Sequence, residues 1–233
     1  MMRPVVLIAG NFLREQRWFV LVLLVWVFGS AALFGLDERL SRDDALFFLR
    51  QQAAYAVALP VLIAAGAIHQ ERRSRRILAV LSKAVERGQY LAGLLLGSAS
   101  LGVIAAVSVC IAGWWMAARV HWPGAHLPAY ALLLMAAAAL VASLAIFFST
   151  FLHPLLAASA TVIAVAAQLG LEGASGVEAL PATALVHALF GFQFQPEWHA
   201  PSTAAGLALG EALLLWLAAT AVFERRDVAM AAE

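Results

Sequence analysis

The sequence predicts an all-α, polytopic integral membrane protein with six membrane-spanning helices and one amphipathic helix outside the bilayer. The chain has 233 residues, of which 64% are hydrophobic and only 12% are charged. Its mean hydropathy is +0.87. A soluble domain of this length cannot bury so much apolar surface, so the bilayer must act as its solvent. The apolar residues also fall in separate runs of membrane length, and a basic segment at 69–90 interrupts them.

The predicted elements follow from the apolar runs, because a helix needs about 20 apolar residues to cross a bilayer. Residues 1–17 are expected to form an N-terminal interfacial segment, and Pro60 is a kink that neighbouring helices can tolerate. The six predicted spans are 18–36, 51–68, 91–118, 128–150, 155–171 and 203–223. The longer connections are a charged loop at 37–50, the loop at 69–90 and an outer segment at 172–202.

The orientation follows from the placement of basic residues. With both termini on one side, eleven of the 15 Lys and Arg residues lie on that side: in 1–17, in 69–90 and in the tail after 223. Basic loops stay in the cytoplasm, so the loop at 69–90 and both termini are predicted to be cytoplasmic. Because the basic residues are sorted by loop and the net charge is only +1, no nucleic-acid partner is expected.

The loop at 69–90 contains an amphipathic helix at Ile77–Val85. At 100° per residue its apolar side chains fill one arc of about 160°, while polar side chains from Ser82 to Arg87 lie opposite. One interpretation is a contact with anionic membrane lipid, to which each basic residue near the surface contributes about 1 kcal/mol. The other is a docking surface for a cytoplasmic protein.

The residues of this loop resemble a known family. Glu71-Arg72-Arg73, then Ile77-Leu78-Ala79-Val80-Leu81-Ser82 and finally Arg87 are similar to the cytoplasmic loop of ABC transporter permeases of the type-2 exporter class. The tail Phe223-Glu224-Arg225-Arg226-Asp227 is similar to the ending common in that family. The chain departs from the family pattern at Ser74-Arg75, Lys83-Ala84 and Gly93-Leu94.

The resemblance implies a prokaryotic inner-membrane permease whose coupling helix sits in a cleft of an ATP-binding cassette subunit. The coupling residues it implies are Glu71, Ile77, Leu78, Val80, Leu81, Ser82 and Arg87. The ATPase must be a separate chain, because no GxxxxGK[ST] phosphate loop occurs here. ATP and Mg²⁺ would then bind to that partner, this chain would hold no cofactor and would not be an enzyme, and a second permease (a homodimer or a related chain) would complete the transporter.

Other residues are candidates for transport or for packing. Glu211 is a carboxylate within a predicted span, which makes it a candidate for the translocation path or gate or, alternatively, a structural polar contact. Phe190 and Phe192 lie in the outer segment, either in an aromatic belt or, by resemblance, in an outer re-entrant gate. The pairs Gly93–Gly97 and Gly206–Gly210 have the spacing that lets helices approach closely.

Three other classes of protein need weighing. Ser175 lies in a Gly-x-Ser-Gly sequence like that of rhomboid-type intramembrane proteases, but a polar turn is the preferred interpretation. The six histidines are scattered without paired spacing, and the single Cys110 lies in an apolar run, so no metal site is predicted. A membrane scaffold that transports nothing remains an alternative. If the chain is a permease, its apolar composition favours a hydrophobic or amphipathic substrate.

Overall fold

The computed structural model describes residues 2–37, 39–73, 85–170, 181–192 and 202–225. The described part of the chain is all-α, as predicted. Its helices are α1 (Met2–Glu15), α2 (Arg17–Gly35), α3 (Arg42–Arg73), α5 (Arg87–Arg119), α6 (Leu127–Ser149), α7 (Pro154–Gly170), α8 (Pro181–Phe190) and α9 (Ser202–Arg225).

Five of these helices are long and apolar enough to cross a membrane, which indicates an integral membrane protein. They are α2, α3, α5, α6 and α9. The predicted fifth span, 155–171, corresponds to α7, which has 17 residues. At 1.5 Å per residue α7 is about 25 Å long, a little shorter than the ~30 Å hydrocarbon core. The structure therefore gives five full-length candidate spans, and the sixth span stays a prediction.

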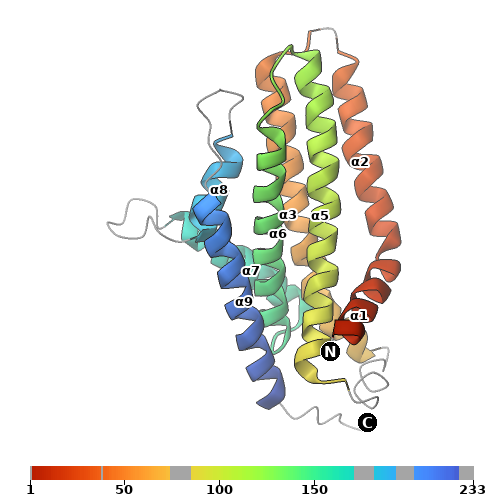
Figure 1. The fold of residues 1–233 in the computed structure, drawn as a ribbon, viewed down its shortest axis with the longest axis vertical. Coiled ribbons are helices and arrows are strands. Elements are labelled where there is room, and N and C mark those ends of the chain that lie inside the picture. Colours follow the sequence, from red (N-terminus) through yellow and green to blue (C-terminus); the bar gives the residue numbers. More distant parts are fainter. Residues whose placement is uncertain (1, 38, 74–84, 171–180, 193–201, 226–233) are drawn as a thin grey trace.

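Helix α6 is the centre of the bundle, because it contacts α3, α5, α7, α8 and α9 (Figure 1). Its apolar stretch is 67% buried, whereas those of α2 and α9 are only 22% buried. The sequence explains this position, since α6 carries the alanine run Ala136–Ala139 and small residues allow helix backbones to approach closely. The exposed apolar side chains of α2 and α9 face outward, where lipid or another chain can cover them.

Helix α3 begins at Arg42, before the predicted span at 51, so the loop predicted at 37–50 is partly helical. The cause is a capping box at its first turn. The Ser41 hydroxyl accepts a hydrogen bond from the Asp44 backbone N–H at 3.2 Å, and the Asp44 carboxylate accepts one from the Ser41 backbone N–H at 3.0 Å. This early start places Arg50 two turns inside a helix.

The bundle has two distinct ends. At one end, which we call the basic end, α3 finishes, α5 begins, α9 finishes and α1 lies close by (Figure 1). This end brackets the predicted coupling loop. At the other end α5 turns tightly into α6, where the Trp114 indole N–H donates to the Gly124 carbonyl at 2.8 Å. Arg42 packs over the Trp122 ring of that turn, with the guanidinium carbon 5.1 Å from the ring centroid.

The two predicted glycine pairs lie in different environments. A Cβ added at Gly93 would lie 2.7 Å from the Ile8 side chain, and one added at Gly97 would lie 2.6 Å from the Phe12 ring. Glycine therefore allows α1 to seat directly on α5. A Cβ added at Gly206 or Gly210 would meet nothing within 4 Å. This second pair faces away from the described helices of its own chain.

Candidate functional site

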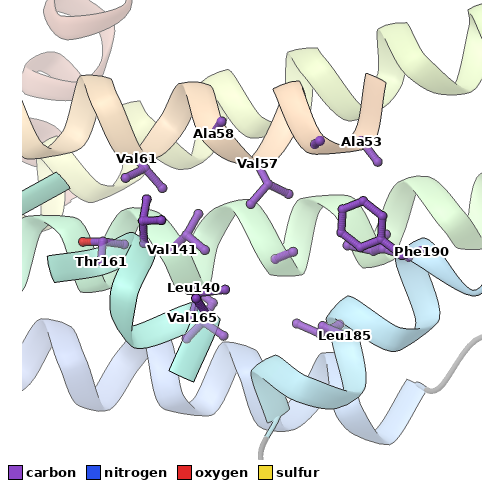
Figure 2. A pocket seen from close by; sticks show the side chains of 15 residues that line it. Ala53, Val57, Ala58, Val61, Leu140, Val141, Thr161, Val165, Leu185 and Phe190 are labelled. Carbon is purple, nitrogen blue, oxygen red and sulfur yellow. The ribbon is translucent and has the colours of Figure 1, made fainter. Parts of the chain in front are cut away.

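A cavity of about 290 Å³ lies between α3, α6, α7 and α8 (Figure 2). Small and branched apolar side chains form its wall, contributed by all four helices. The residues labelled in Figure 2 are Ala53, Val57, Ala58, Val61, Leu140, Val141, Thr161, Val165, Leu185 and Phe190. The cavity reaches the surface of the bundle beside α7, where Val162 of the wall is exposed. A site of this kind can accept an apolar group that arrives through the membrane.

The chemistry of the wall is almost purely apolar. Thr161 is the one lining residue with a polar side chain. Its hydroxyl donates a hydrogen bond to the Ala157 carbonyl within α7 at 2.8 Å, so its donor is already used. The wall therefore offers dispersion contacts and exclusion of water rather than acid–base chemistry.

Ala53 and Phe190 form one end of this cavity, and polar groups lie beyond that end. Arg50 lies one turn before Ala53 on α3, and Tyr130 lies two turns before Ala137 on α6. The Arg50 Nη2 donates to the Phe192 carbonyl at 3.4 Å, and the Tyr130 and Phe192 rings pack with centroids 4.6 Å apart. The three residues join α3, α6 and the chain just after α8.

Two donors of this group have no hydrogen-bond partner among the described residues. Arg50 Nε and the Tyr130 hydroxyl are both buried, and neither has a hydrogen-bond partner in the described part of the chain. A buried polar group without a partner costs about 1–3 kcal/mol, so such groups call for an explanation. The sequence predicts neither residue as part of a site. Arg50 falls in the predicted loop at 37–50, and Tyr130 falls in the predicted span at 128–150. The Ser41-to-Asp44 capping box was the signal that could have placed Arg50 in a helix.

Of the two predicted gate residues, Phe190 lines the cavity and Phe192 follows it by two residues along the chain. Phe190 forms part of its wall and is 44% exposed. Phe192 is fully buried against Tyr130. Phe190 thus belongs to the cavity wall, whereas Phe192 contacts Arg50 and Tyr130. A gating role for Phe190 and Phe192 stays a prediction.

Glu211 does not line this cavity. It is half-buried on α9, beside the face of α9 that carries the buried Ala208 and Ala212. Its Oε2 is buried and has no hydrogen-bond partner among the described residues. Glu211 therefore lies outside the cavity wall that includes Phe190, and its predicted role in the translocation path stays a prediction.

Two of the predicted coupling residues, Glu71 and Arg87, lie at the basic end. Glu71 lies in the last turn of α3, and Arg87 is the first residue of α5. The segment between them includes Ile77, Leu78, Val80, Leu81 and Ser82, which lie outside the described residues.

Arg87 ties the start of α5 to the end of α9. Its Nη1 donates to the Phe223 carbonyl at 3.3 Å and to the Glu224 carbonyl at 2.9 Å. One turn further on, the Tyr90 ring stacks on the Phe223 ring with centroids 6.4 Å apart and planes 20° apart. Gly88 lies against Thr220, where an added Cβ would be 3.2 Å from the Thr220 Cγ2. The two helix ends therefore form one packed unit.

A second, more open cavity of about 740 Å³ lies between α2 and α3. Its wall is apolar apart from Ser30, Gln51 and Gln52. The Gln52 side-chain amide donates to the Ser30 hydroxyl at 3.1 Å, which links the two helices across the gap. The Gln52 Oε1 is buried and has no partner in the residues that the structure describes.

No group of three or more His, Cys, Asp or Glu side chains that could hold a metal occurs within the described residues. A scan against protein-family models and a search of curated proteins both give no match to this chain.

Proposed function

We propose that this protein is the transmembrane permease subunit of an ATP-driven ABC transporter that exports a hydrophobic or amphipathic substrate by alternating access. A separate ATP-binding subunit docks on the coupling helix, and a second permease, identical or related, completes the transporter. The observation that carries the proposal is the architecture of the basic end. There, an amphipathic basic segment connects the two longest described helices, and Arg87 joins one of them to the end of α9.

Length and stiffness make this arrangement suited to transmitting movement. Helices α3 and α5 have 32 and 33 residues, so each is about 50 Å long. Each reaches from the basic end to the opposite end of the bundle (Figure 1). A displacement of the loop at 74–86 acts on the end of α3 and the start of α5, and through Arg87 it also acts on α9. Rigid-body movement of packed helices is a common basis of switching transitions.

The position of the cavity supports transport. Helix α3 lines the cavity with Ala53, Val57 and Val61, and it also leads into the coupling loop. The same helix therefore links the docking surface to the apolar site. With α7 as a short sixth span, tilting of α3 relative to α6 and α7 would open the cavity to alternate sides of the membrane.

The surface of α9 supports pairing with a second permease. Gly206 and Gly210 lie on a face of α9 with open space beside them, among exposed Leu207, Leu213 and Leu214. In a membrane, helix association depends on close packing of small residues rather than on the hydrophobic effect. A second chain seated on this face would use that packing.

The test is a double substitution in the apolar face of the coupling helix, Leu78→Asp together with Leu81→Asp. The tagged chain is purified from its native membranes, and the co-purified protein is assayed for ATP hydrolysis. We expect the wild-type chain to retain a phosphate-loop ATPase and the double variant to lose most of it. Lys83→Gln, on the polar face, is the matched control and should retain the ATPase. Wild-type chain without ATPase activity, or full retention by the double variant, would contradict the proposal and favour a scaffold without transport.

A further inference from the structure

The group formed by Arg50, Tyr130 and the Phe192 carbonyl places a positive charge inside the helical bundle. Arg50 follows the start of α3 at Arg42 by eight residues, or about 12 Å along the helix axis. Charged side chains inside membrane-spanning helices are costly to bury, and they occur mainly where they serve a substrate or ion. The position of the Arg50 charge inside the bundle therefore calls for a functional explanation.

The partners of Arg50 within the chain do not supply that reason. A guanidinium carries five N–H donors. Of these, Nη2 makes one long hydrogen bond to the Phe192 carbonyl, at 3.4 Å, and Nε is buried without a partner. No carboxylate of the described residues forms an ion pair with Arg50. Within the part of the chain that the structure describes, one neutral acceptor thus holds the charge in place.

Tyr130 adds a second unused donor beside the first. Its side chain is fully buried, and its hydroxyl has no hydrogen-bond partner in the part of the chain that the structure describes. Arg50 and Tyr130 both contact Phe192, Arg50 at its backbone carbonyl and Tyr130 at its ring. A cation with an unpaired N–H and an O–H donor without an acceptor among the described residues are complementary to the oxygen atoms of an anion.

Arg50 lies close along α3 to the residues that form one end of the apolar cavity. Ala53 and Phe190 lie at one end of the cavity (Figure 2). Arg50 is one helical turn beyond Ala53, and Phe192 follows Phe190 by two residues. A volume of about 290 Å³ lies at the lower limit for small-molecule sites, so the cavity suits one apolar chain rather than a two-chain lipid.

We propose that Arg50, Tyr130 and the α3–α6–α7–α8 cavity form one binding site for a single-chain anionic amphiphile, such as a fatty acid or an alkyl phosphate. The anionic oxygens accept hydrogen bonds from Arg50 and Tyr130, and the alkyl chain occupies the cavity. This assignment names the substrate class of the permease, and as a statement about transport it rests on the proposed function.

The binding test uses the purified full-length chain in phosphatidylcholine nanodiscs, without any ATPase. The probe is a twelve-carbon fatty acid with a photoreactive diazirine near its methyl end. After irradiation, mass spectrometry locates the label. We expect labelling of cavity residues such as Val57, Val141 and Val165. Dodecyl phosphate should compete with the probe at least tenfold better than dodecanol or dodecylamine of equal chain length. This comparison uses wild-type protein only, so it does not depend on the folding of any variant.

Variants then test two parts of the site separately: the head site, formed by Arg50 and Tyr130, and the tail site, which is the apolar cavity. Arg50→Gln should lower labelling about tenfold, the cost of one charge-assisted hydrogen bond, and Arg50→Lys should restore part of it. Tyr130→Phe should lower it about threefold. Ala54→Leu, which fills the cavity wall, should lower labelling without changing the preference for an anion. Arg42→Gln is the control, because Arg42 is exposed and lies on α3 outside the cavity.

Two results would overturn the inference: label found elsewhere in the chain, or competition by dodecanol equal to that by dodecyl phosphate. The outcome is also independent of the transporter proposal. Anion-selective labelling by a chain that recruits no ATPase would keep the site and reject the transporter. ATPase recruitment without anion-selective labelling would do the reverse.

Discussion

Arg87 and Arg50 are both half-buried, both lie near the start of a long helix, and both donate to a backbone carbonyl next to the end of another helix. Their surroundings differ. Arg87 makes bonds of 2.9 and 3.3 Å to two successive carbonyls, and aromatic stacking of Tyr90 on Phe223 supports it. Arg50 makes a single bond of 3.4 Å and leaves a buried Nε without a partner. A satisfied arginine fastens two helices together, whereas an under-satisfied one is available to a ligand.

The largest loss of stability is expected for Arg87→Met. Hydrogen bonds to charged groups contribute about 1.5–3 kcal/mol each, and partial exposure reduces that contribution. We expect the free energy of unfolding, measured by titration with dodecyl sulfate in mixed micelles, to fall by about 2–3 kcal/mol. Arg119→Met, at an exposed position at the other end of α5, should stay within about 0.5 kcal/mol of wild type. Equal losses in the two variants would show that the Arg87 contacts contribute little.

The second prediction tests whether the packed unit at the basic end extends along α5. Gly97→Leu would drive a side chain into the Phe12 ring, where an added Cβ already lies at 2.6 Å. Overpacking costs about 1–3 kcal/mol, so we expect a loss of about 2 kcal/mol in the same titration, with release of α1 from α5. The matched variant Gly210→Leu meets open space and should change the stability of the single chain by less than about 0.5 kcal/mol. If both variants lose stability equally, α1 does not seat on α5 as described.

The opposite sign is expected for Arg50→Met. This change removes a half-buried charge whose Nε is buried without a partner among the described residues, and it keeps an apolar side chain of similar length. Replacement of poorly satisfied buried charges by apolar residues is often stabilising. We expect the free energy of unfolding to rise by about 1 kcal/mol in the absence of anionic amphiphile. A loss as large as that of Arg87→Met would mean that Arg50 is structural, and it would erase the contrast between the two arginines.

The smallest effect is expected for Tyr130→Phe. The hydroxyl is buried without a partner in the described residues, so its removal ends a desolvation cost and breaks no hydrogen bond. Because the ring still packs on Phe192 at 4.6 Å, thermal melting in neutral detergent should be unchanged or slightly higher. A clear drop in melting temperature would indicate that the hydroxyl has a structural partner and would weaken the assignment of the head site.

The sequence predicted the fold class and most of the helices, because membrane-length apolar runs leave few alternatives to α-helix. It could not predict which run would be central. The runs of α2 and α6 have similar mean hydropathy, 2.3 and 2.6, and the alanine-rich sequence of α6 distinguishes the buried helix from the exposed one. The two glycine pairs show the same limit. They have identical spacing, but Gly93–Gly97 faces α1 and Gly206–Gly210 faces open space.

The candidate site was less accessible to sequence reasoning. The place of Phe190 and Phe192 in the outer segment makes them candidates, and the structure puts Phe190 in the cavity wall and Phe192 against Tyr130. Arg50 was assigned to a loop because charged residues precede it. The capping box at Ser41 overrides that composition and carries α3 back to Arg42. Tyr130 gave no signal at all, because its role depends on the contact of α6 with α3.

We propose that ATP hydrolysis on a partner subunit moves the helices around the cavity. The most direct measurement is a spin-label distance between α3 and α7 across the cavity, with labels at the exposed positions Ala58 and Val162 and with the native Cys110 replaced by serine. The complex isolated with its ATPase is measured without nucleotide and after trapping with ATP and vanadate. If the proposal holds, the distance distribution changes on trapping, and it does not change in the Leu78→Asp, Leu81→Asp chain exposed to the same ATPase. An identical distribution in both states of the wild-type complex would contradict it.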